Sequence, residues 1–329
     1  MPATNATPNI DDVRRIADKV SNWGRWGPDD QLGTLNHLTS ERVAAAAKEV
    51  RRGDLISMAV PFDDKGPQRG GWGRFNPIHV MMRDGNDAVT GTTVRDFYGG
   101  FDGYVRGTDD LLILPLQAGT QWDALSHMVF EGKIYNGYEA TEVSSLGALK
   151  NDIAQAREKL IGRGVLLDIA RWKDKPWLEG GEVIDGEDLE ACAVAQRVEV
   201  LPGDIVLVRT GQMGQVKAEG DWGDYAGGYS ARAPGLGLSS AEWIHAKDAA
   251  AVATDTWGAE VLPTETLDVS MPMHIILIVH MGLTLGEIFD LEALADDCAA
   301  DGVYSFLFSA PPLPITRAVG SPINPVAIK

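Results

Sequence analysis

The most informative segment of the sequence is Gln117-Ala-Gly-Thr-Gln121-Trp-Asp123-Ala-Leu-Ser-His127. Its polar side chains follow one another at spacings of four, two and four residues, and each can bind a metal ion or move a proton. Asp123 and His127 would share a face if they lay on one helical turn. A carboxylate and an imidazole held close together suit metal binding or general acid/base chemistry.

Outward from this stretch, short apolar runs alternate with helix-like periodic segments, which indicates an α/β fold. Residues 111–116 predict a buried strand that delivers the motif, and residues 145–161 predict a helix. Further helices are expected at residues 11–20, 40–52, 188–196, 241–246, 274–281 and 291–300. Further strands are expected at residues 165–170, 205–209, 250–254 and 303–308.

Two glycine-rich loops are expected at residues 62–76 and 220–237, and loops of this length are often lids or binding loops. The sequence has no internal repeat and no clear linker, so it predicts a single domain over residues 1–329. Within that domain, residues 1–10 are expected to be loose.

The charge balance excludes several classes of partner. The chain has 329 residues, with 47 acidic against 29 basic side chains and a net charge of −18. Such a surface repels phosphate backbones and anionic membranes, so neither nucleic acid nor a membrane is an expected partner. Two distant cysteines, no recognisable signal peptide and no long apolar run predict a cytoplasmic protein.

Several common catalytic signatures are missing from the sequence. It contains no HExxH, GxSxG, Walker A or strand-linked GxGxxG pattern. What remains is a set of polar residues in apolar contexts, among them His274 at the head of an apolar run and Glu287 between Leu285 and Ile288. A buried carboxylate or imidazole must be paired, protonated or bound to a metal. Taken alone, each is more often a structural residue than a ligand.

The segment Gln117–His127 resembles the HxGTHxDxPxH motif of the cyclase family, which includes bacterial kynurenine formamidase and isatin hydrolase. Gly119, Thr120, Asp123 and His127 match the motif. Gln117 and Gln121 stand at the two leading histidine positions, and Leu125 replaces the proline. The resemblance continues, in the family's order, through residues 202–211, Thr254-Asp255, and His274 followed by Glu287 and residues 289–291. It spans residues 20–325 of the sequence.

This resemblance implies the swivelling β/β/α-type fold of the cyclase family, an α/β architecture with a mixed sheet or partly closed barrel flanked by helices. It also implies that His127 is the proton donor and acceptor. The metal ligands that it implies are Asp123, His274 and Glu287, with His280 in reserve for His274. The family resemblance further implies a homodimer.

The two glutamines leave three alternatives open, because a carboxamide oxygen is a weaker and harder ligand than imidazole. Gln117 and Gln121 bind the metal through oxygen, which favours Mn²⁺ or weaker Zn²⁺ binding. Alternatively, one of two metal ions is lost and the site at Asp123, His274 and Glu287 remains. In the third case no metal binds and the glutamines hydrogen-bond the substrate. A single divalent ion, Mn²⁺ or Zn²⁺, ranks first.

The sequence therefore predicts a metal-dependent hydrolase whose partner is a small-molecule substrate, a cyclic or aromatic amide, imide or lactone. Metal-activated water would attack the carbonyl, with His127 as general acid/base. Two alternatives stay open. One is a dehydratase or lyase that uses His127 as its acid/base, and the other is a non-catalytic binding protein on a degenerate hydrolase scaffold.

Three tryptophans are candidate substrate-binding residues. Trp122 lies inside the motif and could form a wall of the pocket. Trp72 and Trp26 lie in glycine-rich segments and could stack on a flat substrate. Any single tryptophan is more often an ordinary core or loop-anchoring residue.

Overall fold

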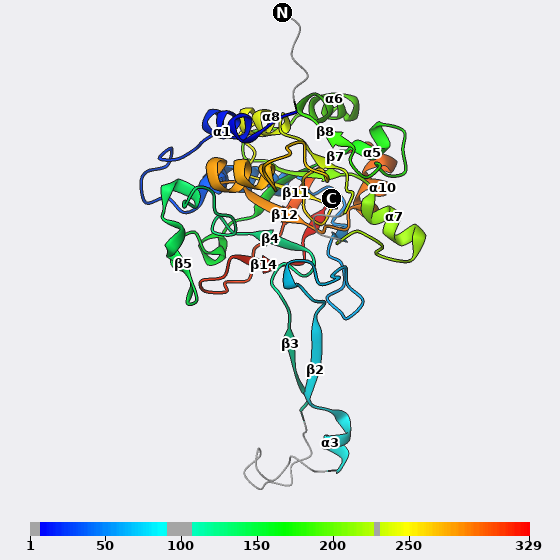
Figure 1. The fold of residues 1–329 in the computed structure, drawn as a ribbon. Coiled ribbons are helices and arrows are strands. Elements are labelled where there is room, and N and C mark those ends of the chain that lie inside the picture. Colours follow the sequence, from blue (N-terminus) through cyan, green and yellow to red (C-terminus); the bar gives the residue numbers. More distant parts are fainter. Residues whose placement is uncertain (1–6, 91–106, 227–230) are drawn as a thin grey trace, which may run out of the picture.

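The computed structural model describes residues 7–90, 107–226 and 231–329, and in these ranges one curled sheet of nine strands organises the fold (Figure 1). In spatial order its strands are β1 (Leu55–Ser57), β15 (Val326–Ile328), β13 (Ser305–Ser309), β7 (Ile161–Asp168), β9 (Ile205–Arg209), β11 (Ala251–Thr254), β12 (Thr284–Glu287), β4 (Gln121–Asp123) and β14 (Gly320–Pro322). The four strands from β7 to β12 run parallel, and the remaining pairs are antiparallel. The expected α/β class with a mixed sheet flanked by helices is confirmed.

Helices cover both faces of the sheet, because its central strands are apolar on both sides. The helical segments are α1 (Ile10–Lys19), α2 (Ser40–Ala46), α3 (Gly85–Thr90), α5 (Ile169–Trp172), α6 (Gly186–Gln196), α7 (Gln212–Glu219), α8 (Ser240–Ala246), α9 (Pro272–His274), the π-helix η8 (Ile275–Met281) and α10 (Glu292–Asp301). Val165 and Leu167 of β7 pack with α1, α6, α8 and η8 in one core cluster. Leu166 points the other way and packs with α10 in a second cluster.

Local sequence signals account for where several helices begin. Asn9 and Asp12 form a capping box at the start of α1, and Asp185 and Asp188 form one at the start of α6. Residues 7–10 are therefore more ordered than expected, whereas residues 1–6 lie outside the described ranges. Thr39 caps α2, but that helix ends at Ala46 rather than near residue 52 and continues only as a 3₁₀ turn to Glu49.

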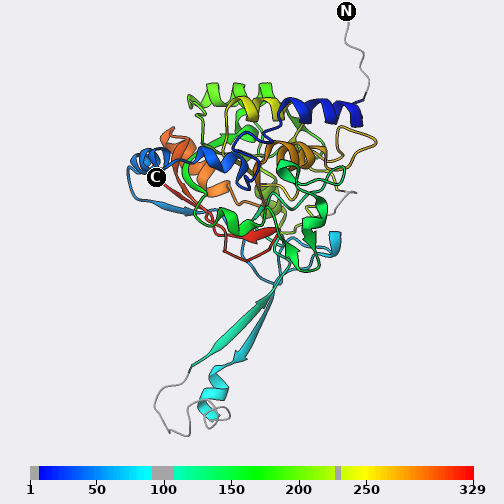
Figure 2. The same cartoon turned by 90° about the vertical axis from the view of Figure 1, so that its left-hand side faces the viewer.

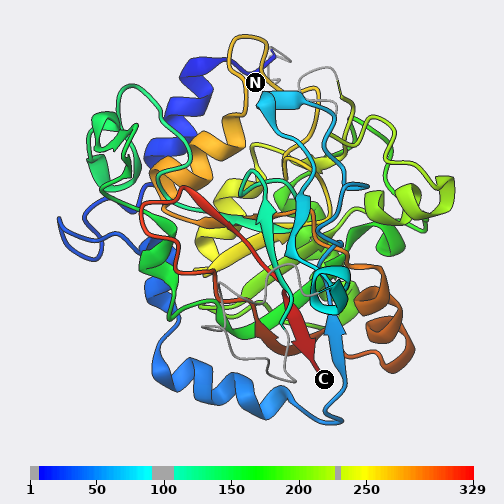
Figure 3. The ribbon, with the colours of Figure 1, turned by 90° about the horizontal axis from the view of Figure 1, so that it is seen from below.

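A long two-stranded arm leaves the body on the side of β4 and β14, and α3 follows its first strand (Figures 1 and 2; Figure 3 shows the arm from below). Its strands are β2 (Ile78–Arg83) and β3 (Asp109–Ile113), which pair antiparallel. The expectation of a buried strand at residues 111–116 is therefore wrong. The apolar run does form a strand, but β3 is exposed along its length because β2 is its only strand partner in the described ranges.

The expected helix at residues 145–161 is also wrong. This stretch instead contains part of a small hairpin, β5 (Val143–Ser144) with β6 (Gly147–Ala148), and the 3₁₀ helix η6 (Ile153–Ala156). Gly147, Asn151 and Leu160 all have positive φ values, which no right-handed helix can contain. The segment does have apolar residues at helical spacing, but residues in the left-handed conformation prevent one continuous helix.

The remaining short elements connect the larger ones. Strands β8 (Val183–Ile184) and β10 (Gly235–Leu236) form a parallel pair, the second of them inside the expected loop at 220–237, of which residues 227–230 lie outside the described ranges. The 3₁₀ helices not yet given are η1 (Gly33–His37), η3 (Gly71–Gly73), η4 (Tyr135–Gly137) and η5 (Ala140–Glu142). Among the helices of the described ranges, none combines the length and apolar character needed to cross a bilayer.

Candidate functional site

Strands β4 and β12 bring the motif and the distal carboxylate together. Their antiparallel register places Gln121 opposite Glu287 and Trp122 opposite Gly286. Side chains alternate along a strand, so Gln121 and Asp123 point to one face of the sheet and Trp122 to the other. Residues paired across two strands share a face, which puts Glu287 on the side of Gln121 and Asp123.

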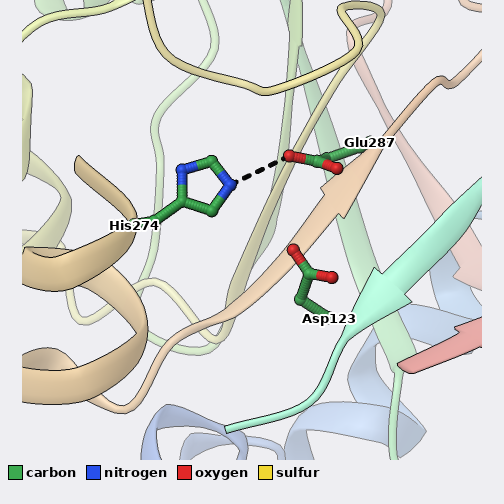
Figure 4. Close-up of side chains that lie close together, drawn as sticks. All are labelled: Asp123, His274 and Glu287. Carbon is green, nitrogen blue, oxygen red and sulfur yellow. Dashed lines mark hydrogen bonds and ion pairs between the residues drawn. The ribbon is translucent and has the colours of Figure 1, made fainter. Parts of the chain in front are cut away.

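His274 completes this group from the helical side of the cleft. It lies where α9 passes into the π-helix η8, a helix type that is often found at functional sites. Its Nε2 lies 3.1 Å from Glu287 Oε1 (Figure 4). Its Nδ1 lies 2.5 Å from Glu260 Oε1. The donor atoms of Asp123, His274 and Glu287 all lie within 4.8 Å of one another. The structure thus brings three of the expected ligands into one buried cluster.

The electrostatics of this cluster reflect deep burial. Burial, followed by the charge of Glu287, raises the pKa of Asp123 to about 8. Burial by itself would lower the pKa of His274, but hydrogen bonds to Glu260 and Glu287 outweigh it and raise that pKa to about 10. A bound cation would reverse the effect on Asp123, because a nearby positive charge favours the ionised carboxylate.

The donor atoms fit a divalent cation. Both carboxylate oxygens of Asp123 and the Oε1 atom of Gln121 are buried without a hydrogen-bond partner among the described residues. Buried polar atoms are almost always hydrogen-bonded, and leaving them unsatisfied costs about 1–3 kcal/mol each. Oxygen donors and one imidazole, with no thiolate, are a ligand set that suits Mn²⁺ or Zn²⁺.

His127 lies beside the cluster without belonging to it. It sits in the turn after β4, and its Nε2 is 3.6 Å from Asp123 Oδ1, too long for a direct hydrogen bond. Burial, followed by the charges of Arg74 and His274, lowers the pKa of His127 to about 3. The imidazole is therefore neutral near pH 7 and is able to accept a proton. Asp123 and His127 are close through a strand and a turn rather than through one helical turn.

The two glutamines of the motif occupy different environments. The Nε2 of Gln121 donates a 2.7 Å hydrogen bond to Glu287 Oε2, which leaves its oxygen on the cluster side of the strand without a partner. The Nε2 of Gln117 instead donates to the backbone carbonyl of Val319, at 3.4 Å. Gln121 is therefore tied to the cluster through Glu287, whereas the side chain of Gln117 is tied to the backbone just before β14.

The three tryptophans also separate. Trp72 lines the pocket that also contains His127, His274 and Glu287, as expected. Trp122 does not: it is fully buried in the core, its Nε1 donates to Ala310, and strand alternation turns it away from Asp123. Trp26 packs edge-on against His37, with ring centroids 5.3 Å apart, and does not line the pocket either.

Sequence reasoning missed Glu260 and Arg74. Glu260 is buried beside His274, and the rule that drew attention to Glu287, a carboxylate between apolar neighbours, would also have found it between Ala259 and Val261. Arg74 lines the pocket from a glycine-rich loop, where no local pattern marks it. The reserve ligand His280 instead stacks on Trp23, with ring centroids 5.4 Å apart.

Asp255 has a structural part in holding the site. Its carboxylate accepts hydrogen bonds from the backbone amides of Thr210 and Gly211 and from the Thr210 hydroxyl, each at 2.8 Å. These bonds join the end of β11 to the end of β9, where the Thr254-Asp255 and Arg209-Thr210 elements of the resemblance meet. This pairing rigidifies the strand ends near the cluster.

Comparisons with known protein families and solved structures identify relatives of this chain. The sequence model described as "Putative cyclase" matches residues 56–261. A crystal structure described as a novel cyclase shares 38% sequence identity and a TM-score of 0.84, covering 94% of this chain and 100% of that one. No curated protein matches the sequence.

More distant structures share the fold. An isatin hydrolase bound to the product analogue thioisatinate has 16% identity and a TM-score of 0.60, covering 88% of this chain and 98% of its own. Isatin hydrolase A from Ralstonia solanacearum gives the same identity and TM-score, covering 88% of this chain and 97% of its own. The family match over residues 56–261 and the 38% identity over nearly the whole chain lead to one conclusion: this chain belongs to the cyclase family.

Proposed function

We propose that the chain is a metal-dependent hydrolase that opens an amide, imide or lactone bond in a small ring-containing molecule. The observation that carries the proposal is the convergence of Asp123, His274 and Glu287, whose donor atoms lie within 4.8 Å of one another. Two of these oxygens have no other partner among the described residues. When bound there, a divalent cation supplies Lewis-acid polarisation of a carbonyl group and lowers the pKa of water.

The chain's own residues then supply proton transfer and orientation. His127, whose Nε2 lies 3.6 Å from Asp123 Oδ1, accepts a proton from the attacking water and returns it to the leaving group. Asp123 orients that water, since its Oδ1 lies 3.6 Å from His127 Nε2. Gln121 holds the Glu287 carboxylate in place through its 2.7 Å hydrogen bond.

Glu260 is a positioning residue in this proposal. It accepts the Nδ1–H of His274, which fixes the tautomer and aims the Nε2 lone pair at the cluster. The single cluster of three donors supports one ion rather than two, with the partnerless oxygen of Gln121 as an additional donor. Mn²⁺ and Zn²⁺ both suit this set.

The pocket walls favour a flat substrate. Trp72, Trp257, Met128 and Met271 line the pocket beside the polar cluster. Indole faces and flexible thioethers are surfaces on which an aromatic or unsaturated ring packs well. A few convergent polar groups on an otherwise apolar wall are the usual arrangement of a small-molecule site.

The test is a screen of cyclic amides, imides and lactones with the Mn²⁺- or Zn²⁺-loaded protein, read by product mass. A product heavier by one water supports the hydrolase. A product lighter by one water would instead indicate a dehydratase or lyase. Glutamine in place of histidine at positions 117 and 121 favours this alternative. Binding without turnover would assign the degenerate binding protein.

Replacing Glu260 with glutamine is expected to weaken metal binding by about 10–100-fold, the usual loss when a partner of a ligating histidine is changed. Glutamine keeps an acceptor for Nδ1–H but removes the charge that makes the imidazole a better ligand. Competition with a metallochromic chelator measures the change, and Glu190→Gln, which alters an exposed carboxylate, is the control. An unchanged metal affinity in folded Glu260→Gln protein would contradict the positioning role.

A further inference from the structure

Arg74 occupies an unusual place in the pocket. It follows the turn η3, and its guanidinium carbon lies 5.1 Å from the ring centroid of Trp257 and 5.9 Å from that of Trp72. It lines the same pocket as His127, His274 and Glu287. A guanidinium that rests on indole faces is held by its flat side, which leaves the N–H groups on its edge available.

In the described ranges no carboxylate lies within ion-pair distance of the Arg74 guanidinium. Its direct side-chain contacts are with the two indoles, and its charge acts on Asp123 and His127 from a longer distance. Two other arginines with little exposed surface in the described ranges are paired. Arg209 makes 2.7 Å contacts with both Asp168 and Glu292, and Arg163 lies 2.6 Å from Asp204. Arg74 is thus a pocket cation without a fixed anion.

We propose that Arg74 recognises a carboxylate group on a ring-containing ligand of this pocket. The ring would lie against the tryptophan and methionine walls, and the carboxylate would meet the edge of the guanidinium in a two-pronged hydrogen-bonded pair. With a net charge of −18, the protein as a whole repels anions, so such a ligand needs a local positive group. The inference rests on the proposed function only in placing the reaction at this pocket.

A carboxylate can reach Arg74 from two sources. It can be part of the substrate before reaction, or it can be the group that hydrolysis of an amide, imide or lactone creates. The alternative reading is that Arg74 only offsets the negative charge of Asp123 and Glu287, and that reading predicts no preference for an anionic ligand.

The experiment is calorimetric titration with benzoate and with its neutral analogue benzamide, in one buffer with Mn²⁺ and in one with chelator. We expect benzoate to bind the unmodified protein more tightly than benzamide does, and Arg74→Met to weaken benzoate binding at least tenfold while leaving benzamide unchanged. Arg74→Lys should recover part of the loss, because it restores the charge without the planar fork. Arg51→Met, at an exposed arginine, is the matched control.

Equal benzoate affinity in Arg74→Met and unmodified protein, or no benzoate binding at all, would overturn the proposal. Because each comparison is between variants in the same buffer, the result is independent of whether a metal binds or any substrate is turned over. Once a substrate is known, steady-state kinetics distinguish the two sources of the carboxylate. A carboxylate already on the substrate predicts a raised KM in Arg74→Met, whereas a carboxylate formed by hydrolysis predicts weakened product inhibition with an unchanged KM.

Discussion

Replacing His127 with alanine is expected to lower kcat/KM by about 10²–10⁴-fold, the range for loss of a positioned general acid/base. The imidazole lies beside Asp123 and is neutral at pH 7, so one of its ring nitrogens carries a free lone pair. Alanine provides neither acceptor nor donor, while Asp123, His274 and Glu287 stay in place. Metal content should therefore be unchanged, which separates loss of proton transfer from loss of the metal site.

His280→Ala is the matched control for this variant, because His280 is a partly buried histidine that stacks on Trp23 outside the pocket. It should keep nearly full activity. Steady-state kinetics on the substrate identified by the screen measure both variants. Full activity in His127→Ala, or an equal loss in both variants, would remove His127 from the mechanism.

Replacing Trp122 with alanine is expected to lower the free energy of unfolding by about 3–5 kcal/mol, the usual cost of truncating a large core aromatic residue. Trp122 is fully buried, packs edge-on against Phe289 and Phe308, and donates from Nε1 to the Ala310 carbonyl oxygen. Gly286, opposite it on β12, leaves the space that the indole fills. The substitution therefore creates a cavity and orphans a buried carbonyl group.

Urea unfolding followed by circular dichroism measures this loss. Trp72→Ala is the contrasting variant, since Trp72 is 51% exposed, and substitution at such a site usually changes stability by less than about 0.5 kcal/mol. The two variants should show opposite phenotypes, with Trp122→Ala losing stability and Trp72→Ala losing ligand affinity. A stable Trp122→Ala protein with impaired ligand binding would restore Trp122 to the pocket.

The sequence predicted best those elements whose signal is local. The strand at 205–209 is an uninterrupted apolar run after a Pro-Gly-Asp turn, and the structure has it with the same bounds. The helix expected from residue 188 begins at Gly186, where Asp185 provides the cap. The prediction of a helix at residues 145–161 was wrong because three residues with positive φ interrupt an otherwise helical apolar spacing. Two of them are an asparagine and a leucine, and neither residue type by itself indicates that conformation in the sequence.

The candidate site was predictable only through the family motif. No spacing rule connects Asp123 with His274 and Glu287, because β4 and β12 are brought together by the sheet order rather than by proximity in sequence. The same motif also suggested that Trp122 forms a wall of the pocket. Trp122 lies in a strand rather than in a helix, and alternate residues of a strand face opposite ways, so its side chain points away from Asp123. Whether the three clustered residues bind a metal stays a prediction.

The most direct test of that central claim is elemental analysis of the purified protein beside Asp123→Asn, each loaded with Mn²⁺ and Zn²⁺ and then exchanged into metal-free buffer. We expect one equivalent of metal per chain in the unmodified protein and its loss in Asp123→Asn, with both proteins folded. Two equivalents would mean that the glutamines serve as ligands of a second ion. No retained metal in folded, unmodified protein would contradict the account.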